Sequence, residues 1–286
     1  MTPPPPRPRR SALYLPASNP RAIAKARELP CDMVILDLED SVAPDAKSAA
    51  REQAVAAVRD GGFGGRELIV RVNAFDSEWG ADDLAALAGV RPDGVLVPKV
   101  DGPDDLARIA AAMGADRRPL WAMIETPLSL FRLEPLAATA AALGTAGFIL
   151  GLNDLAKDMG AMPGRDRAPF FGAMGLAVAA ARAYRIAILD GVCNAIDDDA
   201  RLDRELAQAV EYGFDGKTLI HPRQVDRCNA AFTPDAAAIA AARRIVAAFD
   251  DPANGARGAI RLDGEMVERL HLDQAQRTLA RAGDPT

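Results

Sequence analysis

Short apolar segments recur along the chain, and alanine-rich stretches of helical composition separate them. We recognise eight such segments, most of which end in a polar or charged residue: 11–16, 33–39, 67–73, 94–100, 119–126, 147–154, 186–192 and 216–221. An apolar run followed by a helix and then by the next run is typical of parallel strands joined by helical crossovers. The repetition predicts an α/β protein with a closed (β/α)8 barrel, the TIM-barrel architecture.

The chain of 286 residues is long enough for one barrel, which takes roughly 250 residues, with additions at both ends. Residues 1–9 are rich in Pro and Arg, and we expect them to be disordered or extended. We expect the catalytic barrel over 10–249. Over 250–286 we expect a linker and a tail, with a turn at Asp263-Gly264 and a final helix at about 266–282, that packs on its own barrel or reaches an adjacent subunit.

Composition narrows the class of protein. A formal net charge of −6 argues against a nucleic-acid partner. The N-terminus has no apolar run of the secretory type, and no segment is long enough to cross a membrane, so we expect a cytoplasmic protein with no membrane partner. The three cysteines, Cys31, Cys193 and Cys228, have no metal-type spacing and are expected to be buried, reduced thiols.

The carboxyl ends of the strands of such a barrel form one mouth, where these enzymes carry their chemistry. Here the ends supply Asp37, Glu39, Asp40, Arg71, Asn73, Lys99, Glu125, Asp154 and His221. The apolar core of a barrel does not accommodate so many charged side chains. A ring of charged side chains around one mouth therefore predicts an active site.

Glu125 ends the fifth predicted strand and Asp154 ends the sixth. Neighbouring strands lie about 4.8 Å apart, so the two carboxylates would repel each other unless a cation or a proton lay between them. Two carboxylates with water suit Mg²⁺. The alternative is that each carboxylate caps a helix N-terminus, and we favour the metal site.

Arg71 lies within an apolar strand, and its side chain points to the face opposite Val70 and Val72. If that face is the barrel mouth, its guanidinium can hold a carboxylate or a developing oxyanion. The alternative is a structural ion pair with Glu39 or Asp40, and both can hold at once.

The acidic group Asp37, Glu39 and Asp40 is interpreted as an outer layer that binds metal-bound water and pairs with Arg71. Lys99 either pairs with this acidic ring or binds substrate, and a Schiff-base role is disfavoured because the carboxylates hold the amine protonated.

The chain has only two histidines, His221 and His271. They form no zinc pair, and no Ser-His-Asp set is evident. We expect both to be structural, with His221 the better candidate for the wall of the site.

These residues, in this order, resemble the citrate lyase β-subunit-like (CitE-like) acyl-CoA lyases of the HpcH/HpaI aldolase/citrate lyase family. The matching pieces are Arg10-Ser-Ala-Leu-Tyr-Leu-Pro, Leu36-Asp-Leu-Glu-Asp-Ser-Val-Ala-Pro-Asp-Ala-Lys, Arg71-Val-Asn, Pro98-Lys99, Ile124-Glu-Thr, Gly151-Leu-Asn-Asp-Leu and Gly216-Lys-Thr-Leu-Ile-His-Pro. The likeness covers nearly the whole chain from Arg10. Its most specific part is the Leu-Asp-Leu-Glu-Asp block with the spacing Lys-x-x-x-Arg51.

The resemblance implies a Mg²⁺-dependent carbon–carbon lyase that acts on 3-hydroxyacyl-CoA thioesters such as malyl-, citramalyl- or citryl-CoA. It implies that Glu125 and Asp154 hold the metal and that Arg71 binds the 2-keto acid. It also implies that the coenzyme A site is lined by the stretch from Tyr14 to Arg21, which includes Ser18, and by Lys25, Ile220 and His221.

Members of this family that act alone use an aspartate from the C-terminal tail of an adjacent subunit as the base. This chain has Met266-Val267-Glu268, so the acid is one methylene longer, which displaces the carboxylate by about 1 Å. Ala17 stands where glycine is usual, and Leu270 where proline is frequent. The first hypothesis is a homo-oligomeric lyase, a trimer or a dimer of trimers, with Glu268 crossing to a neighbour.

Four alternatives stay open. The protein could be a citrate lyase β subunit that works in a larger complex, or a thioesterase that directs water at malyl-CoA. It could be a non-catalytic CoA-ester-binding protein whose altered tail acid has lost turnover. A simple aldolase acting on free keto acids is the fourth, although it would not need a first strand that lines a CoA site.

Overall fold

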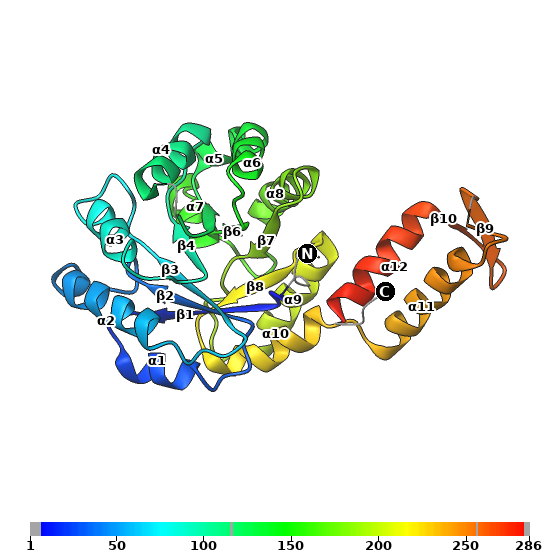
Figure 1. Ribbon diagram of the computed structural model, residues 1–286, viewed down its shortest axis with the longest axis horizontal. Coiled ribbons are helices and arrows are strands. Elements are labelled where there is room, and N and C mark those ends of the chain that lie inside the picture. The colour runs from blue at the N-terminus through cyan, green and yellow to red at the C-terminus, as the bar shows by residue number, and fades with distance from the viewer. Residues whose placement is uncertain (1–6, 115–116, 256, 283–286) are drawn as a thin grey trace. The chain divides into compact units, whose positions relative to one another are not determined.

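The computed structural model describes residues 7–114, 117–255 and 257–282. Residues 1–9 are predicted to be disordered or extended, and residues 1–6 of this segment lie outside the described residues. The barrel prediction is confirmed, because the first eight strands form a closed parallel barrel in chain order (Figure 1). They are β1 (Ser11–Pro16), β2 (Met33–Asp37), β3 (Glu67–Arg71), β4 (Gly94–Val97), β5 (Leu120–Ile124), β6 (Gly147–Leu150), β7 (Ala187–Asp190) and β8 (Gly216–Leu219).

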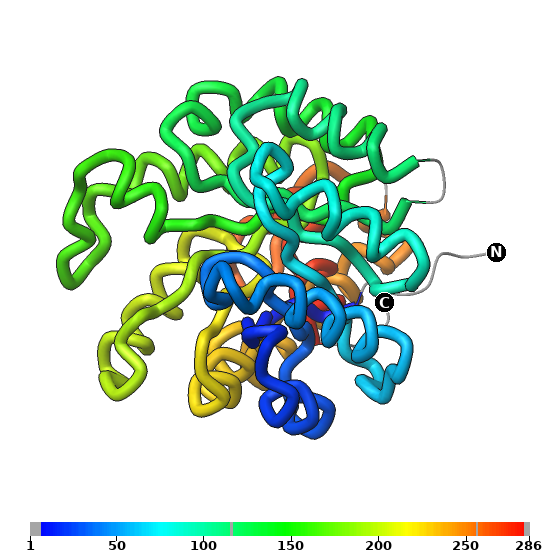
Figure 2. Tube along the Cα trace, turned by 90° about the vertical axis from the view of Figure 1, so that its left-hand side faces the viewer, coloured from blue at the N-terminus to red at the C-terminus, as the bar shows by residue number. Residues whose placement is uncertain are grey.

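Helices follow one another around the barrel in chain order, as the change of colour from blue through green to yellow shows (Figure 2). They are α1 (Pro20–Ala26), α2 (Lys47–Asp60), α3 (Gly80–Leu87), α4 (Pro103–Met113), α5 (Pro127–Phe131), α6 (Leu133–Ala142), α7 (Leu152–Met159), α8 (Phe171–Ala183), α9 (Asp199–Tyr212) and α10 (Val225–Phe232). Short 3₁₀ helices cover Pro44–Ala46, Ala168–Phe170 and Pro222–Gln224. Asn19 caps the start of α1, because its side chain accepts a hydrogen bond from the Ala22 N–H.

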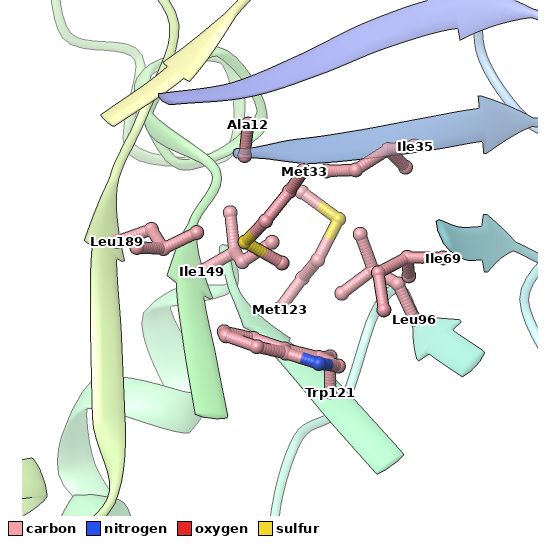
Figure 3. Packing of buried hydrophobic residues seen from close by; sticks show 9 residues of the cluster. All are labelled: Ala12, Met33, Ile35, Ile69, Leu96, Trp121, Met123, Ile149 and Leu189. Atoms are coloured by element: carbon pink, nitrogen blue, oxygen red, sulfur yellow. The ribbon is translucent and has the colours of Figure 1, made fainter. Parts of the chain in front are cut away.

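The barrel interior is a dry apolar core made by every second residue of the strands (Figure 3). Its buried members are Ala12, Met33, Ile35, Ile69, Leu96, Trp121, Met123, Ile149 and Leu189. The alternation continues to the carboxyl ends. Asp37 follows Ile35 by two residues and Arg71 follows Ile69 by two, so the same inward face ends in charged side chains at the mouth.

The strands are shorter than predicted, which corrects the position of Asp154. Strand β6 ends at Leu150, and Gly151 begins the turn into α7, so Asp154 lies in the first turn of that helix and does not end a strand. The apolar run Gly147–Leu150 reaches the barrel rim, and the polar residues after it turn onto a helix. In the first turn of α7 the helix dipole stabilises the Asp154 carboxylate, and the side chain still faces the mouth of the barrel.

A second group of charges, which the sequence reasoning missed, lies on the outer face of the sheet. Lys217 is fully buried, with Nζ 2.8 Å from Asp190 Oδ2 and 3.2 Å from Glu205 Oε2. Arg167, also buried, contacts Asp190 at 2.7 Å. Because buried charges are stable only when paired, this cluster joins β7 and β8 to α9 as a structural unit.

Replacing Lys217 with Met is expected to lower the free energy of unfolding by about 3 kcal/mol, because two buried carboxylates lose the buried ammonium that they share. Urea unfolding measures the change, and Lys157→Met, which removes the same charge from an exposed position of α7, is expected to change it by less than about 0.5 kcal/mol. A loss below about 1 kcal/mol in Lys217→Met would contradict the structural role.

The chain divides into two compact units, residues 1–229 and 230–286, with the boundary inside α10. The second unit contains α11 (Ala236–Asp250), β9 (Ala259–Leu262), β10 (Glu265–Glu268) and α12 (Arg269–Arg281). It has apolar clusters of its own, one of them around Phe249, Ile260 and Val267. Helix α11, placed in the barrel by the sequence analysis, therefore lies in the second unit.

The expected turn at Asp263-Gly264 joins β9 to β10, and both residues have positive φ, 52° and 91°. This is the backbone that a two-residue hairpin requires. Residues 266–268, expected to begin the last helix, belong to strand β10 instead, because Val267 pairs with Ile260 across the hairpin. Among the described residues, no helix combines the length and apolar character that a membrane span needs.

Candidate active site

A cavity of about 250 Å³ lies at the carboxyl ends of the barrel strands. Its lining includes six of the predicted site residues: Tyr14, Asp37, Asp40, Arg71, Asp154 and Ile220. The other walls are mainly apolar, with Met123, Leu150 and Val192 among them. The expected mouth is therefore a shaped, partly desolvated cavity.

Arg71 is held in a fixed orientation by its neighbour across the sheet. Strands β2 and β3 pair in a register that sets Asp37 beside Arg71. Arg71 Nε and Nη2 donate to the two oxygens of Asp37 at 2.6 and 2.7 Å. Burial opposes ionisation of Asp37, but Arg71 and the hydrogen bond from Ser41 outweigh it and hold the pKa of this carboxyl below its usual value.

The remaining edge of the guanidinium faces the other acids. Arg71 Nη1 lies 2.8 Å from Glu39 Oε2 and 3.4 Å from Asp40 Oδ2, so the ion pair considered as the structural alternative is present. The ring of Tyr14 lies 4.9 Å from the guanidinium carbon. Burial raises the pKa of Glu39 to about 8, although Arg71 opposes the shift. Arg71 is thus surrounded by acids on one side and open to the cavity on another.

Lys99 lies between the two carboxylates proposed as metal ligands. Its Nζ is 2.6 Å from Asp154 Oδ2 and 3.5 Å from Glu125 Oε1. Its backbone N–H donates to Glu125 Oε1 at 2.7 Å, from a left-handed conformation with φ 53° that is rare for a side chain of this size. Lys99 therefore pairs with Glu125 and Asp154, and not with the acidic group Asp37, Glu39 and Asp40 as considered from the sequence, and its ammonium is the cation that relieves the repulsion of the two carboxylates.

The two carboxylates also fit a divalent cation. Glu125 is fully buried, and its Oε2 has no hydrogen-bond partner among the described residues. Burial raises the pKa of Glu125 to about 7, against the lowering effect of Lys99. A Cβ at Gly151 would collide with that same Oε2, so the glycine leaves the space free. Two carboxylates that share one ammonium, one of them with a second oxygen that has no partner among the described residues, suit Mg²⁺, which takes few protein ligands and keeps water.

The structure describes no group of three or more His, Cys, Asp or Glu that could hold a metal within residues 7–114, 117–255 and 257–282. A metal at this mouth would therefore have Glu125 and Asp154 as its acidic ligands. Asp37, Glu39 and Asp40 lie around Arg71 instead, so their contact with metal-bound water stays a prediction.

The residues predicted to line a coenzyme A site fall into two places. Tyr14 points into the barrel beneath Arg71, and burial raises its pKa well above the usual value. Arg21 and Lys25 are exposed one turn apart on α1, and no ion pair joins either of them to another residue that the structure describes. Ser18, partly buried, lies just before α1. Tyr14 therefore belongs to the cavity, whereas Arg21 and Lys25 form a basic outer surface.

Ile220 and His221 follow β8. Ile220 lines the cavity, while His221 precedes the 3₁₀ helix Pro222–Gln224, where its Nδ1 accepts a hydrogen bond from the Arg223 N–H at 3.2 Å. His271 Nδ1 accepts from the Glu268 N–H at 2.9 Å. The expectation that both histidines are structural is confirmed for these contacts.

Glu268 ends β10 and caps α12, with its side chain accepting a hydrogen bond from the N–H of the third helical residue. It is half-buried within the second unit. Its role as a base for a neighbouring subunit stays a prediction.

The sequence reasoning missed two asparagines at the cavity. Asn153 and Asn194 both line it and exchange hydrogen bonds of 3.2 and 2.7 Å, which tie the loop after β6 to the loop after β7. Asn153 directly precedes Asp154, and Asn194 follows the seventh predicted strand. Including the polar residues two to four positions beyond each strand would have found them.

The motif Lys-x-x-x-Arg51 proves to be a structural clamp. Lys47 Nζ donates to the carbonyl oxygens of Leu38 and Glu39 and to Asn73 Oδ1, at 2.6–2.8 Å. Asn73 and Arg51 in turn both bond to the buried Asp83. The network holds the segments that carry Glu39 and Arg71 in place. The two motif residues therefore position the site from outside the cavity.

A (β/α)8 barrel whose mouth carries an oriented arginine opposite two acids that share a cation belongs to the class of barrel enzymes that act on small anionic substrates. The model described as HpcH/HpaI aldolase/citrate lyase matches residues 10–222. The model described as C-C bond lyase of the TIM-barrel fold matches residues 174–283. The chain belongs to the HpcH/HpaI aldolase/citrate lyase family, as its sequence motifs indicated.

Three similar proteins cover almost the whole chain. A (3S)-malyl-CoA thioesterase of Cereibacter sphaeroides is 43% identical over 275 residues, 96% of this chain and 95% of that protein. The citrate lyase subunit beta of Escherichia coli K12 is 34% identical over 287 residues, 96% of this chain and 94% of that protein. The crystal structure of the protein CitE from Mycobacterium tuberculosis, in complex with magnesium, acetoacetate and coenzyme A, is 33% identical with a TM-score of 0.77, covering 96% of this chain and 98% of that one.

Proposed function

We propose that this chain is a Mg²⁺-dependent enzyme that acts on malyl-CoA or a closely similar hydroxyacyl-CoA thioester, and that it hydrolyses the thioester. The observation that carries the proposal is the cavity that Arg71 shares with Asp154, whose carboxylate is joined through Lys99 to the buried Glu125. The choice of hydrolysis rests on the malyl-CoA thioesterase, which is 43% identical over nearly the full length of both chains.

Each end of a small dicarboxylic thioester has a partner in this cavity. Glu125 and Asp154 would hold Mg²⁺, which when bound supplies a Lewis acid for a substrate oxygen. Arg71, fixed by Asp37 and by the ring of Tyr14, lines the cavity and binds the free carboxylate of the substrate through Nη1, the nitrogen that contacts Glu39 and Asp40 in the free protein. The apolar walls limit the water around these charges, which strengthens both interactions.

The outer residues bind the coenzyme. Arg21 and Lys25 on α1 offer two exposed cations to the phosphates, and Ser18 lies beside them at the start of the same helix. Ile220 and His221 form the wall past which the pantetheine arm enters. Lys99 adds a cation at the reacting end.

The second candidate is a carbon–carbon lyase, which the C-C bond lyase match and the 34% identical citrate lyase subunit favour. In this reaction a base takes the proton of the 3-hydroxyl group, whose oxygen becomes a carbonyl. The bond between C2 and C3 of the acyl group breaks, and its electron pair forms the CoA enolate, which is then protonated. Arg71 would stabilise the released 2-keto acid.

The products of (3S)-malyl-CoA with Mg²⁺ decide between the two reactions. Hydrolysis is expected to release free CoA thiol and malate in equal amounts, without glyoxylate. Glyoxylate with acetyl-CoA, and no free thiol, would replace the proposal by the lyase. Citramalyl- and citryl-CoA in the same assay define the acyl group. Mg²⁺-dependent CoA binding without turnover of any of them would indicate a binding protein, or a subunit that needs a larger complex.

We further propose that the protein is a homo-oligomer in which Glu268 completes the site of a neighbour. Glu268→Ala is expected to lower kcat at least about a hundredfold, the usual contribution of a general acid or base, whereas Glu265→Ala in the same strand is expected to leave it unchanged. Mixing Glu268→Ala with Asp154→Asn protomers should restore activity, since some sites then combine an intact barrel with an intact tail. Unchanged kcat in Glu268→Ala would leave this residue with its capping role alone.

A further inference from the structure

Lys99 occupies the position that a divalent ion would take between Glu125 and Asp154. Its ammonium lies 2.6 Å from one carboxylate and 3.5 Å from the other, and both contacts come from one side chain after β4. The side chain is only 32% exposed, and Asp154 only 18%, so water screens this interaction incompletely.

The backbone conformation of Lys99 supports the position of its ammonium between the two carboxylates. Its φ of 53° lies in the left-handed region, which a long side chain adopts only at a cost. The conformation turns its N–H onto Glu125 Oε1 at 2.7 Å while the side chain reaches over to Asp154. One residue thus holds Glu125 by its backbone and neutralises the carboxylate pair by its side chain.

The geometry points to Lys99 as an intramolecular counter-ion that holds the carboxylate pair in place without metal and is displaced when Mg²⁺ binds. This inference rests on the proposed metal site. Two cations cannot share the space between these acids, so Mg²⁺ and the Lys99 ammonium compete for it. The flexible side chain can withdraw, because about a third of it is already open to solvent. The backbone N–H keeps its bond to Glu125 in both states.

Two variants remove the competing charge. Lys99→Met removes the ammonium and keeps the length of the side chain. Lys99→Asn removes it with a residue that tolerates the left-handed conformation, so it guards against a failure to fold. Lys157→Met makes the same change of charge at an exposed site on α7, three residues after Asp154, and is the matched control.

Calorimetric titration of each purified, chelator-treated protein with MgCl₂ measures the affinity without any substrate. Both Lys99 variants are expected to bind Mg²⁺ about tenfold more tightly than the wild type, a difference of about 1.4 kcal/mol, with Lys157→Met within about twofold. In EDTA both are expected to melt at a lower temperature than the wild type, and Mg²⁺ should raise their Tm by more than it raises that of the wild type.

Affinities and Tm values of both Lys99 variants equal to those of the control would overturn the inference and leave the proposed function standing. A tenfold weaker affinity would also overturn it, because Lys99 would then support the metal. If no variant and no wild-type protein binds Mg²⁺, the inference fails together with the metal assignment. Wild-type protein that turns over no hydroxyacyl-CoA, together with the expected gain in Mg²⁺ affinity in the Lys99 variants, would retain the inference and refute only the proposed reaction.

Discussion

Replacing Arg71 with Lys is expected to lower kcat/KM at least about a hundredfold, or about 2.7 kcal/mol of transition-state stabilisation. The guanidinium bonds both oxygens of Asp37 through Nε and Nη2, which leaves Nη1 for another partner, and the same side chain lines the cavity. An ammonium is a point charge that cannot satisfy Asp37 with two parallel bonds and bind a substrate carboxylate at the same time. It would also lose the planar contact with the ring of Tyr14.

The matched control is Arg108→Lys. Arg108 makes the same two-bond pair, with Asp76, on the exposed surface of α4. We expect no measurable change in kcat/KM there, because exposed pairs contribute little and this one lies outside the cavity. Thermal melts of both variants separate a folding defect from a catalytic one. A near-normal kcat/KM in folded Arg71→Lys would remove Arg71 from the site.

Removing divalent metal is expected to abolish turnover, with a loss of at least about a thousandfold, and added Mg²⁺ should restore it. Asp154→Asn is expected to require much more Mg²⁺ for half-maximal activity, because one of two acidic ligands has lost its charge. Initial rates across a Mg²⁺ titration measure both effects. Asp158→Asn, exposed one turn later on α7, is the control and should leave the titration unchanged.

The same titration should depend on pH. Burial raises the pKa of Glu125 to about 7, so this carboxyl binds a proton increasingly as the pH falls below 7. Because Mg²⁺ binds the carboxylate and not the acid, its apparent affinity is expected to weaken from pH 8 to pH 6. Full activity in excess chelator, at any of these pH values, would refute the metal assignment.

Much of this site was predictable because, in a barrel, the position of a residue along its strand determines where its side chain lies. Asp37, Arg71 and Glu125 each follow an inward-facing apolar residue by two, so strand alternation alone directs them to the mouth. Asp154 lies at the mouth, as predicted, but on a different element from the predicted one. It faces the mouth from the first turn of α7, and a helix turn cannot be distinguished from a strand end in so short an apolar run.

Other features depend on contacts that no local pattern contains. The sequence pattern indicates only that Lys217 belongs to a strand. In the structure it is buried against Asp190 and Glu205, which come from two other elements. Helix α11 resembles the other alanine-rich helices around the barrel. It belongs to the second unit because its apolar face packs with α12 in a cluster of its own.

The sequence by itself determined that this protein is a closed eight-stranded barrel with an acidic and basic mouth, because strand alternation and the β/α repeat are local properties. Only the tertiary structure decided which charges share a partner. The pairing of Arg71 with Asp37 depends on the register of β2 and β3. The position of Lys99 between Glu125 and Asp154 depends on the residues after β4 and β5 and the first turn of α7 meeting at one rim. Such contacts arise from the closure of the barrel, which brings residues far apart in the chain within bonding distance.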